Sequence, residues 1–168
     1  AAPADPAVLA QRAVAEMTFH AITIGMVPLD GIGPDGKPYI GIVGLPTWMW
    51  IANPTVETAG PQTRSVTAGG ITVTATAKLQ NVVWDMGDNR GAASVVTCGA
   101  GTPYQDSYGA KDSPTCGYRY PKQGTYTITA TSHWTVGWSG AGQSGTIPLH
   151  FTTTRPITIG EVQVIRQR

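Results

Sequence analysis

The sequence predicts a mainly β protein, a β-sandwich that carries one short helix near its start. The main observation is the long alternation of residues 125–138, in which Tyr126 and Trp134 fall on one face while threonines fill most of the other. Residues 71–79 alternate in the same way. Such alternation is typical of a strand with one buried and one exposed face, and threonine suits the exposed face because its branched Cβ favours extended backbone. Trp84, between these strands, is large enough to fill the centre of a sandwich core.

A helix is expected over residues 7–17. Asp5 is a good N-cap residue, and Pro6 suits the first helical position. Apolar residues follow at helical spacing: Val8, Leu9, Ala13, Val14 and Met17. This stripe is small and rich in alanine, so it predicts close packing, either on the protein's own sandwich or on a partner or second copy.

The N-terminal part is expected to extend the sandwich. Residues 19–27 and 45–52 are predicted strands, and residues 53–62 are polar and rich in turn-forming residues, as linkers are. We therefore assign residues 1–60 to a helix and strand extension that packs on the sandwich, and residues 61–168 to the sandwich itself.

The composition points away from charged ligands. Only 12% of the residues are charged and the formal net charge is +1, so neither nucleic acid nor an anionic membrane surface is an expected partner. No apolar run is long enough to span a bilayer, and membrane insertion is not expected. Low charge together with 21 Gly and 13 Pro fits a secreted β protein better than a cytosolic enzyme. Residues 1–5 resemble what remains after cleavage of a signal peptide.

Cys98 and Cys116 are the two cysteines of the chain, and both lie in one loop-rich segment. An even pair in a secreted protein predicts a disulfide, which would stabilise the fold by about 3 kcal/mol by closing that loop. The alternatives are two free thiols or part of a metal site. Zinc normally needs four ligands, and no histidine or further cysteine lies nearby in the sequence.

No metal site and no cofactor are expected. Four aspartates could lie together near the long loop: Asp85, Asp88, Asp106 and Asp112. Calcium loops place their ligands at short fixed spacing, as in D-x-D-x-D-G, and no segment has this spacing. These aspartates are more simply residues that cap turns.

Two segments resemble a known family. Residues 83–89 read VWDMGDN and resemble the W-D-F-G-D-G signature of PKD-type domains, and residues 120–128 read YPKQGTYTI and resemble the Y-x-x-x-G-x-Y-x-V element that follows it. The resemblance covers residues 71–138 and implies an immunoglobulin-like β-sandwich used outside the cell for spacing, adhesion or ligand contact. The family's motif residues are chiefly structural, so a fold role is expected for Trp84, Asp85, Gly87, Asp88, Tyr120, Gly124 and Tyr126.

The chain also departs from that family. Met86 stands where the family has an aromatic residue, Asn89 stands where it has glycine, and the loop before Tyr118 is longer than usual. The whole chain is similar to a group of secreted actinobacterial proteins of unassigned function, most distinctly over residues 46–50 and 111–117.

Trp48 and Trp50 are the leading binding candidates. They lie two residues apart and therefore on the same side of a strand. An exposed tryptophan pair can stack on sugar rings or anchor a protein partner, whereas the alternative is a core strand that buries them. Tyr104 and Tyr108, in the long loop, could extend this contact surface.

Residues 31–37 satisfy the G-x-x-x-x-G-K pattern of a phosphate-binding loop, but Pro38 stands where that loop needs Ser or Thr to bind magnesium. Proline also biases Lys37 away from the helical conformation that should begin there. Asp35 and Gly36 are more simply a hairpin turn. Nucleotide binding through this segment is therefore a remote alternative.

No residue set specifies a reaction, and the protein is not expected to be an enzyme. A serine nucleophile would need a G-x-S-x-G turn with a histidine and a carboxylate behind it, and residues 142–145 lack that pattern. His20, His133 and His150 each fit the polar face of a strand.

The sequence thus predicts a secreted, non-catalytic module at the bacterial cell surface that contacts a protein partner or assembles with itself. Its contact elements would be the helix, the Trp48 and Trp50 segment, and the loop between the cysteines. Binding of a cell-wall glycan is the alternative function.

Overall fold

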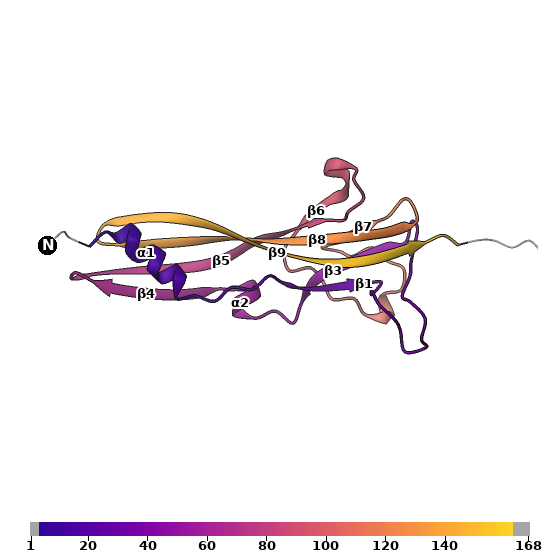
Figure 1. Cartoon of the computed structure of the whole chain (residues 1–168), viewed down its shortest axis with the longest axis horizontal. Helices are drawn as coiled ribbons and strands as arrows, with labels where there is room; N and C mark the ends of the chain where they lie inside the picture. The colour runs from indigo at the N-terminus through magenta and orange to yellow at the C-terminus, as the bar shows by residue number, and fades with distance from the viewer. Residues whose placement is uncertain (1–3, 163–168) are drawn as a thin grey trace, which may run out of the picture.

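Three long strands set the shape of the molecule (Figure 1). The computed structural model describes residues 4–162 of the 168-residue chain. Its longest strands, β5 (Ile71–Asp85), β8 (Gly124–Gly140) and β9 (Gln143–Gly160), run along most of the long axis. The prediction of a mainly β protein with a short N-terminal helix and a disulfide is confirmed. Residues 1–3 and 163–168 of the predicted extension and sandwich lie outside the described residues.

The described strands form two sheets. The other elements are, in chain order, α1 (Pro6–Ala15), β1 (Thr23–Val27), β2 (Gly41–Ile42), β3 (Pro46–Ala52), α2 (Val56–Ala59), β4 (Gln62–Ala68), the 3-10 turn η1 (Gly91–Ser94), β6 (Val95–Cys98), the 3-10 turn η2 (Asp106–Tyr108) and β7 (Gly117–Arg119). The larger sheet has the order β2-β9-β8-β5-β4, with β6 also paired to β5, and the smaller sheet has the order β1-β3-β7. All pairings are antiparallel except the short one of β2 with β9.

The helix begins as the sequence predicts. The Asp5 carboxylate accepts a hydrogen bond from the Ala7 amide at 3.0 Å, and Pro6 is the first helical residue. Ala10 and Ala13 are fully buried, because their small side chains let the helix lie close to β4, β5 and β8. The helix therefore packs on the protein's own sheet, which was one of the two predicted outcomes.

A β-bulge joins the two halves of β5. Val73, Ala75 and Ala77 are buried at odd positions, whereas Val82 and Trp84 are buried at even positions. The pairing of β5 with β8 shifts between Leu79 and Asn81, where one extra residue is inserted. Because strand side chains alternate, this extra residue is what keeps both apolar halves on the same face of the sheet.

Two hydrophobic cores result. One lies under α1 at the end of the molecule that carries the N-terminus, around Trp134 and Val136. The other lies between the two sheets, and it joins Met49 of β3 to Trp84 and Ile128 of the larger sheet. Each core therefore contains residues from both before and after position 60. The expected linker over residues 53–62 contains the single turn α2.

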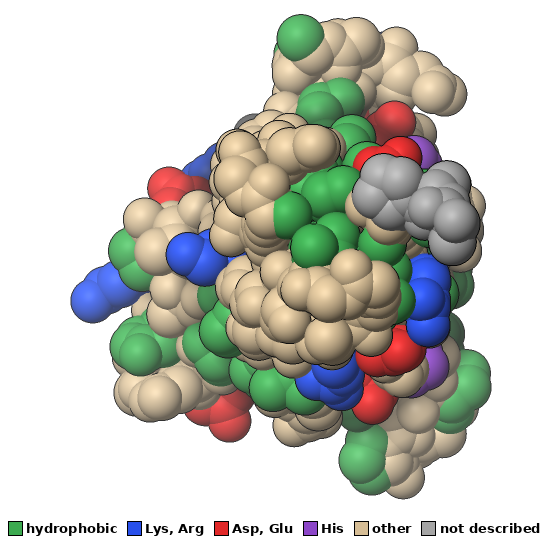
Figure 2. All heavy atoms as spheres, turned by 90° about the vertical axis from the view of Figure 1, so that its left-hand side faces the viewer, with side chains coloured by type: hydrophobic (Ala, Val, Ile, Leu, Met, Phe, Trp, Pro, Cys, Tyr) green, Lys and Arg blue, Asp and Glu red, His purple; other side chains and the backbone are tan. Residues whose placement is uncertain are grey.

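Charged side chains make up only 12% of the chain. Seen from the end that carries α1, hydrophobic side chains gather at the centre, and acidic and basic side chains lie around them in small mixed groups (Figure 2). No helix of the described part is both long and apolar enough to cross a membrane.

Candidate functional site

An aromatic cluster forms where the disulfide-closed loop crosses β3. It consists of Trp48, Tyr104 and Tyr108. The Tyr108 ring stacks on Trp48 at a centroid distance of 5.3 Å and an interplanar angle of 8°, and Tyr104 meets Trp48 edge-on at 5.2 Å. The indole Nε1–H of Trp48 donates to the carbonyl oxygen of Lys111 at 2.8 Å. Trp48 is only 3% exposed, whereas Tyr104 and Tyr108 are half-buried, so the tyrosines are the more accessible rings of the cluster.

Trp50 lies on the same side of β3 as Trp48, but its ring packs on β1 and not on the tyrosines. Its register partner on β1 is Gly25. A Cβ atom at Gly25 would lie 2.2 Å from the indole nitrogen of Trp50, so only glycine leaves room for this ring. On its other side Trp50 forms an isolated bridge with Gly101, at the start of the loop. Trp50 is therefore half-buried between β1 and the loop.

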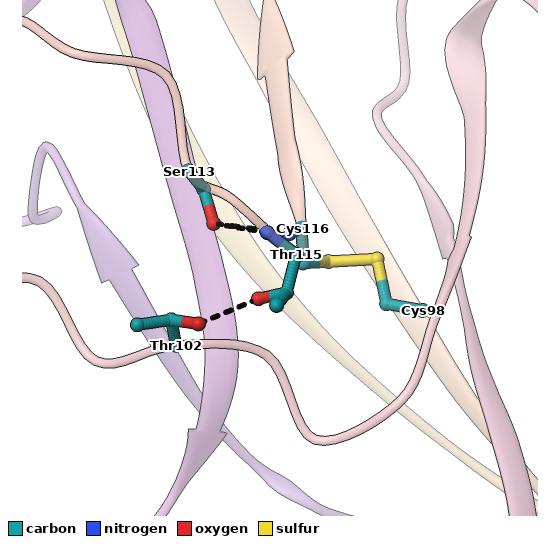
Figure 3. Close-up of a disulfide and its surroundings, with 5 residues drawn as sticks. All are labelled: Cys98, Thr102, Ser113, Thr115 and Cys116. Atoms are coloured by element: carbon teal, nitrogen blue, oxygen red, sulfur yellow. Dashed lines mark hydrogen bonds between the residues drawn. A yellow bond between two sulfur atoms is a disulfide. The ribbon is translucent and has the colours of Figure 1, made fainter.

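The loop is held at several points (Figure 3). Cys98 and Cys116 form the predicted disulfide. Beside it, the hydroxyl groups of Thr102 and Thr115 lie 2.7 Å apart, and the Ser113 hydroxyl accepts a hydrogen bond from the Cys116 amide at 3.0 Å. These contacts fix the loop residues that carry the two tyrosines.

An ion pair holds the far end of the loop. The guanidinium of Arg119 donates two hydrogen bonds, each 3.0 Å long, to the Asp112 carboxylate, and a further one to the carbonyl oxygen of Gly44. The hydrogen bond from Arg119 lowers the pKa of Asp112. The pair therefore connects the loop to the segment before β3.

Two hollows adjoin the aromatic cluster, and a third adjoins one of them. One of about 280 Å³ is lined by Trp48, Thr102, Tyr108, Lys111, Asp112 and Pro114. A second, of about 200 Å³, lies on the other side of Trp48 beside Tyr104 and Leu45. A third, of about 190 Å³, shares Val27, Leu45 and Pro46 with the second and continues to Ile40 and Ile42. The second and third hollows thus form one continuous surface, and the first meets it at Trp48.

The motif residues lie away from this surface. Asp85 accepts a hydrogen bond from the Gly87 amide at 2.9 Å, and Trp84 lies in the core between the sheets. Gly87 has a φ of 74°, and a Cβ there would lie 2.4 Å from the carbonyl oxygen of Thr127. The Tyr120 hydroxyl donates to the carbonyl oxygen of Met86 at 2.7 Å, and burial raises the pKa of Tyr120 well above its usual range. These contacts tie the turn after β5 to the start of β8.

The second motif aspartate is the centre of a polar network that the sequence did not predict. Asp88 accepts hydrogen bonds from the Tyr118 hydroxyl at 2.7 Å and from Arg90 Nε at 2.8 Å, and Arg90 also donates to the Tyr118 hydroxyl. Burial alone would raise the pKa of Asp88, but these two donors outweigh it and the pKa is lowered. Nearby, the Tyr126 hydroxyl donates to the carbonyl oxygen of Lys122 at 2.6 Å, across the turn that contains Gly124.

The segment that matched the phosphate-loop pattern is a closed turn. The Gly33 amide donates to the carbonyl oxygen of Lys37 at 2.7 Å, and the Lys37 amide donates to the Asp35 carboxylate at 3.0 Å. A phosphate-binding loop needs such amides free and a helix directly after them. Here these two amides are occupied, and the chain continues into β2.

The surface around the aromatic cluster offers apolar contact. Among residues 4–162, three or more His, Cys, Asp or Glu side chains nowhere gather closely enough to hold a metal ion. No protein-family model, curated protein or solved structure matches this chain. His20 faces Glu57 at 3.0 Å on the surface, far along the chain from any serine of the loop. The continuous hollows and their aromatic rings are thus the feature from which a function can be argued.

Proposed function

We propose that this chain is a secreted, non-catalytic interaction module with an immunoglobulin-like β-sandwich, and that it binds a protein partner through an apolar surface beside the aromatic cluster. We call it the Leu45 surface. It consists of Val27, Pro28, Ile40, Ile42, Leu45 and Pro46, which line one hollow.

The exposure of these apolar side chains is the observation that carries the proposal. Ile40 is 52% exposed, Leu45 is 43% exposed and Ile42 is 37% exposed. Single exposed apolar residues are ordinary, but a contiguous group beside a hollow is typical of a contact site. The neighbouring Tyr104 and Tyr108 belong to a residue type that is enriched among the anchors of protein interfaces.

The setting is consistent with an extracytoplasmic role. A structural disulfide is typical of proteins that fold in oxidising compartments, and Cys98 and Cys116 form one. With a formal net charge of +1, binding would depend on apolar area more than on charge, so it should change little with ionic strength.

The test compares Leu45→Asp with Val56→Asp. Val56 is 57% exposed on α2 and lies outside the three hollows, so it controls for adding a charge to an exposed apolar site. Each protein is run by size-exclusion chromatography with light scattering, alone and after incubation with an extract of its own cell envelope. We expect a larger species with the wild type and with Val56→Asp, and its loss with Leu45→Asp. A species that survives Leu45→Asp, or a wild type that stays monomeric and retains no protein, would refute the proposal.

The hollow of about 280 Å³ supports a second candidate, binding of a cell-wall glycan. It has an aromatic wall in Tyr108 and a polar rim in Lys111 and Asp112, the combination that sugar sites use to stack a ring and bind its hydroxyl groups. Trp48, under Tyr108, would report binding by its fluorescence. Quenching by a glycan that persists in Tyr108→Phe and disappears in Tyr108→Ala would favour this function, and silence across a glycan panel would exclude it.

A further inference from the structure

Two histidines lie side by side on the outer face of the larger sheet, and neither lines any of the three hollows. His133 of β8 and His150 of β9 are direct register partners, and their ring centroids are 6.1 Å apart. His150 is exposed and His133 is half-buried. Neither ring takes part in the core or in any contact proposed above.

The pairing type brings these side chains as close as a sheet allows. Pro148 and Pro156 of β9 lack an N–H, yet they pair with β8 in regular register. The even-numbered residues of β9 are therefore the ones whose backbone N–H groups do not donate to β8. His150 is also at an even-numbered position. It therefore forms a non-hydrogen-bonded pair with His133, in which opposite side chains approach most closely. The next pair of this kind, Thr131 and Thr152, has its hydroxyl groups 3.1 Å apart.

The ring separation fits a shared metal ion. A metal–nitrogen bond of about 2.0 Å places the ion roughly 3.2 Å from the centroid of an imidazole ring, so two rings that share an ion have centroids at most about 6.4 Å apart. The observed 6.1 Å lies inside that limit. A small rotation of either side chain would bring the rings closer and make the nitrogen–metal–nitrogen angle smaller.

A third residue of the same row supplies an unused acceptor. Asn81 of β5 is the register partner of His133 on the side opposite to His150. Its Oδ1 atom is buried and has no hydrogen-bond partner among the described residues. A histidine that binds a metal through one ring nitrogen usually donates its other N–H to such an oxygen, which fixes the ring orientation. Asn81 lies where that acceptor is needed by His133.

We propose that His133 and His150 bind one divalent ion that prefers imidazole ligands, with Cu²⁺ as the strongest binder, and that Asn81 positions His133. Imidazole nitrogen suits copper, nickel and zinc, and copper leads the affinity order of the divalent first-row metals. Within residues 4–162 no group of three His, Cys, Asp or Glu forms a metal site. Water therefore completes the coordination, and the ion stays accessible from solvent.

The experiment adds Cu²⁺ to the wild type and to four variants, at a pH above the ordinary histidine pKa. His133→Gln and His150→Gln each remove one ligand. Asn81→Ala removes the acceptor. His20→Gln is the matched control, because His20 is an exposed histidine elsewhere on the surface. Binding is measured by calorimetry and by the nitrogen splitting of the Cu²⁺ electron paramagnetic resonance spectrum, and melting temperatures without metal confirm that each variant folds.

We expect the wild type and His20→Gln to bind one equivalent with splitting from two imidazole nitrogens, and to melt at least about 2 °C higher with the metal. His133→Gln and His150→Gln should lose the two-nitrogen signal. Asn81→Ala should keep it but bind about tenfold more weakly. The assignment would be overturned if His133→Gln and His150→Gln both bound Cu²⁺ as tightly as the wild type does. It would also be overturned if His20→Gln lost the binding.

Discussion

Removing the disulfide tests how the loop that carries Tyr104 and Tyr108 is held on β3, and the expected loss of stability follows from the length of the loop. The bond joins residues 18 positions apart. Loop-closure entropy for a ring of that size is about −10.7 cal/mol/K, so the bond lowers the free energy of the folded chain relative to the unfolded one by about 3 kcal/mol at 25 °C. For a chain of this length, a loss of about 3 kcal/mol corresponds to a fall in melting temperature of roughly 6 to 12 °C.

The perturbation is the double substitution Cys98→Ala with Cys116→Ala, and the assay is guanidinium unfolding followed by two probes. Far-ultraviolet circular dichroism reports the sheets. Tryptophan fluorescence sums the five tryptophans of the chain, and Trp48 is one that the loop covers. The loop covers Trp48 through the Tyr108 ring and the carbonyl oxygen of Lys111. We expect the fluorescence transition to move to lower denaturant than the dichroism transition, because the loop leaves β3 before the sheets unfold.

Two transitions that coincide, with a loss of less than about 1 kcal/mol, would refute this reasoning. The loop would then be held by its non-covalent contacts: the Trp48 stacking, the Thr102 and Thr115 hydroxyl pair, and the Asp112–Arg119 ion pair. The ion pair is exposed on both sides, and such pairs contribute little. For that reason we expect the covalent bond to dominate.

Three further changes have definite expected outcomes. Gly87→Ala should destabilise by about 2 to 4 kcal/mol in chemical unfolding, because its Cβ would collide with the carbonyl oxygen of Thr127 at a φ that favours glycine. Tyr120→Phe should cost about 1 to 3 kcal/mol by leaving the carbonyl oxygen of Met86 unpaired. Since burial raises the pKa of Tyr120, wild-type stability should be full below about pH 10 and fall above it, and the fall should be shallower in Tyr120→Phe. Ala141→Asn should stabilise by about 1 kcal/mol or less, because Ala141 has a φ of 51° in a two-residue turn that favours Asn-Gly. A decrease in melting temperature would contradict this last expectation.

Local signals in the sequence predicted the local structure well. Asp5 and Pro6 act within one turn of chain, so the helix start needed no tertiary information. The alternation of β8 likewise marks a strand regardless of its neighbours. By contrast, the sequence shows the alternation of β5 only over residues 71–79, because the pattern breaks after Leu79. The break is a bulge that only the pairing with β8 identifies as a continuation.

The aromatic cluster and the Leu45 surface were predicted only in part. The shared side of Trp48 and Trp50 follows from strand geometry. What covers that side comes from Tyr104 and Tyr108, which lie far along the chain and reach β3 through the disulfide loop. The exposure of Ile40 and Leu45 was not foreseeable either, since apolar residues in a strand-like segment ordinarily indicate a core.

The position of a single turn determines that the two histidines are cross-strand neighbours. Ala141 and Gly142, with φ values of 51° and 76°, form a two-residue turn between β8 and β9. Once such a turn is placed, every pairing of the hairpin follows by counting back from it, and His133 must face His150. A turn one residue earlier or later would place the two rings on different rows. The glycine-rich sequence around residues 139–145 allows several such turns, so the sequence alone does not determine the register that brings the two imidazoles together.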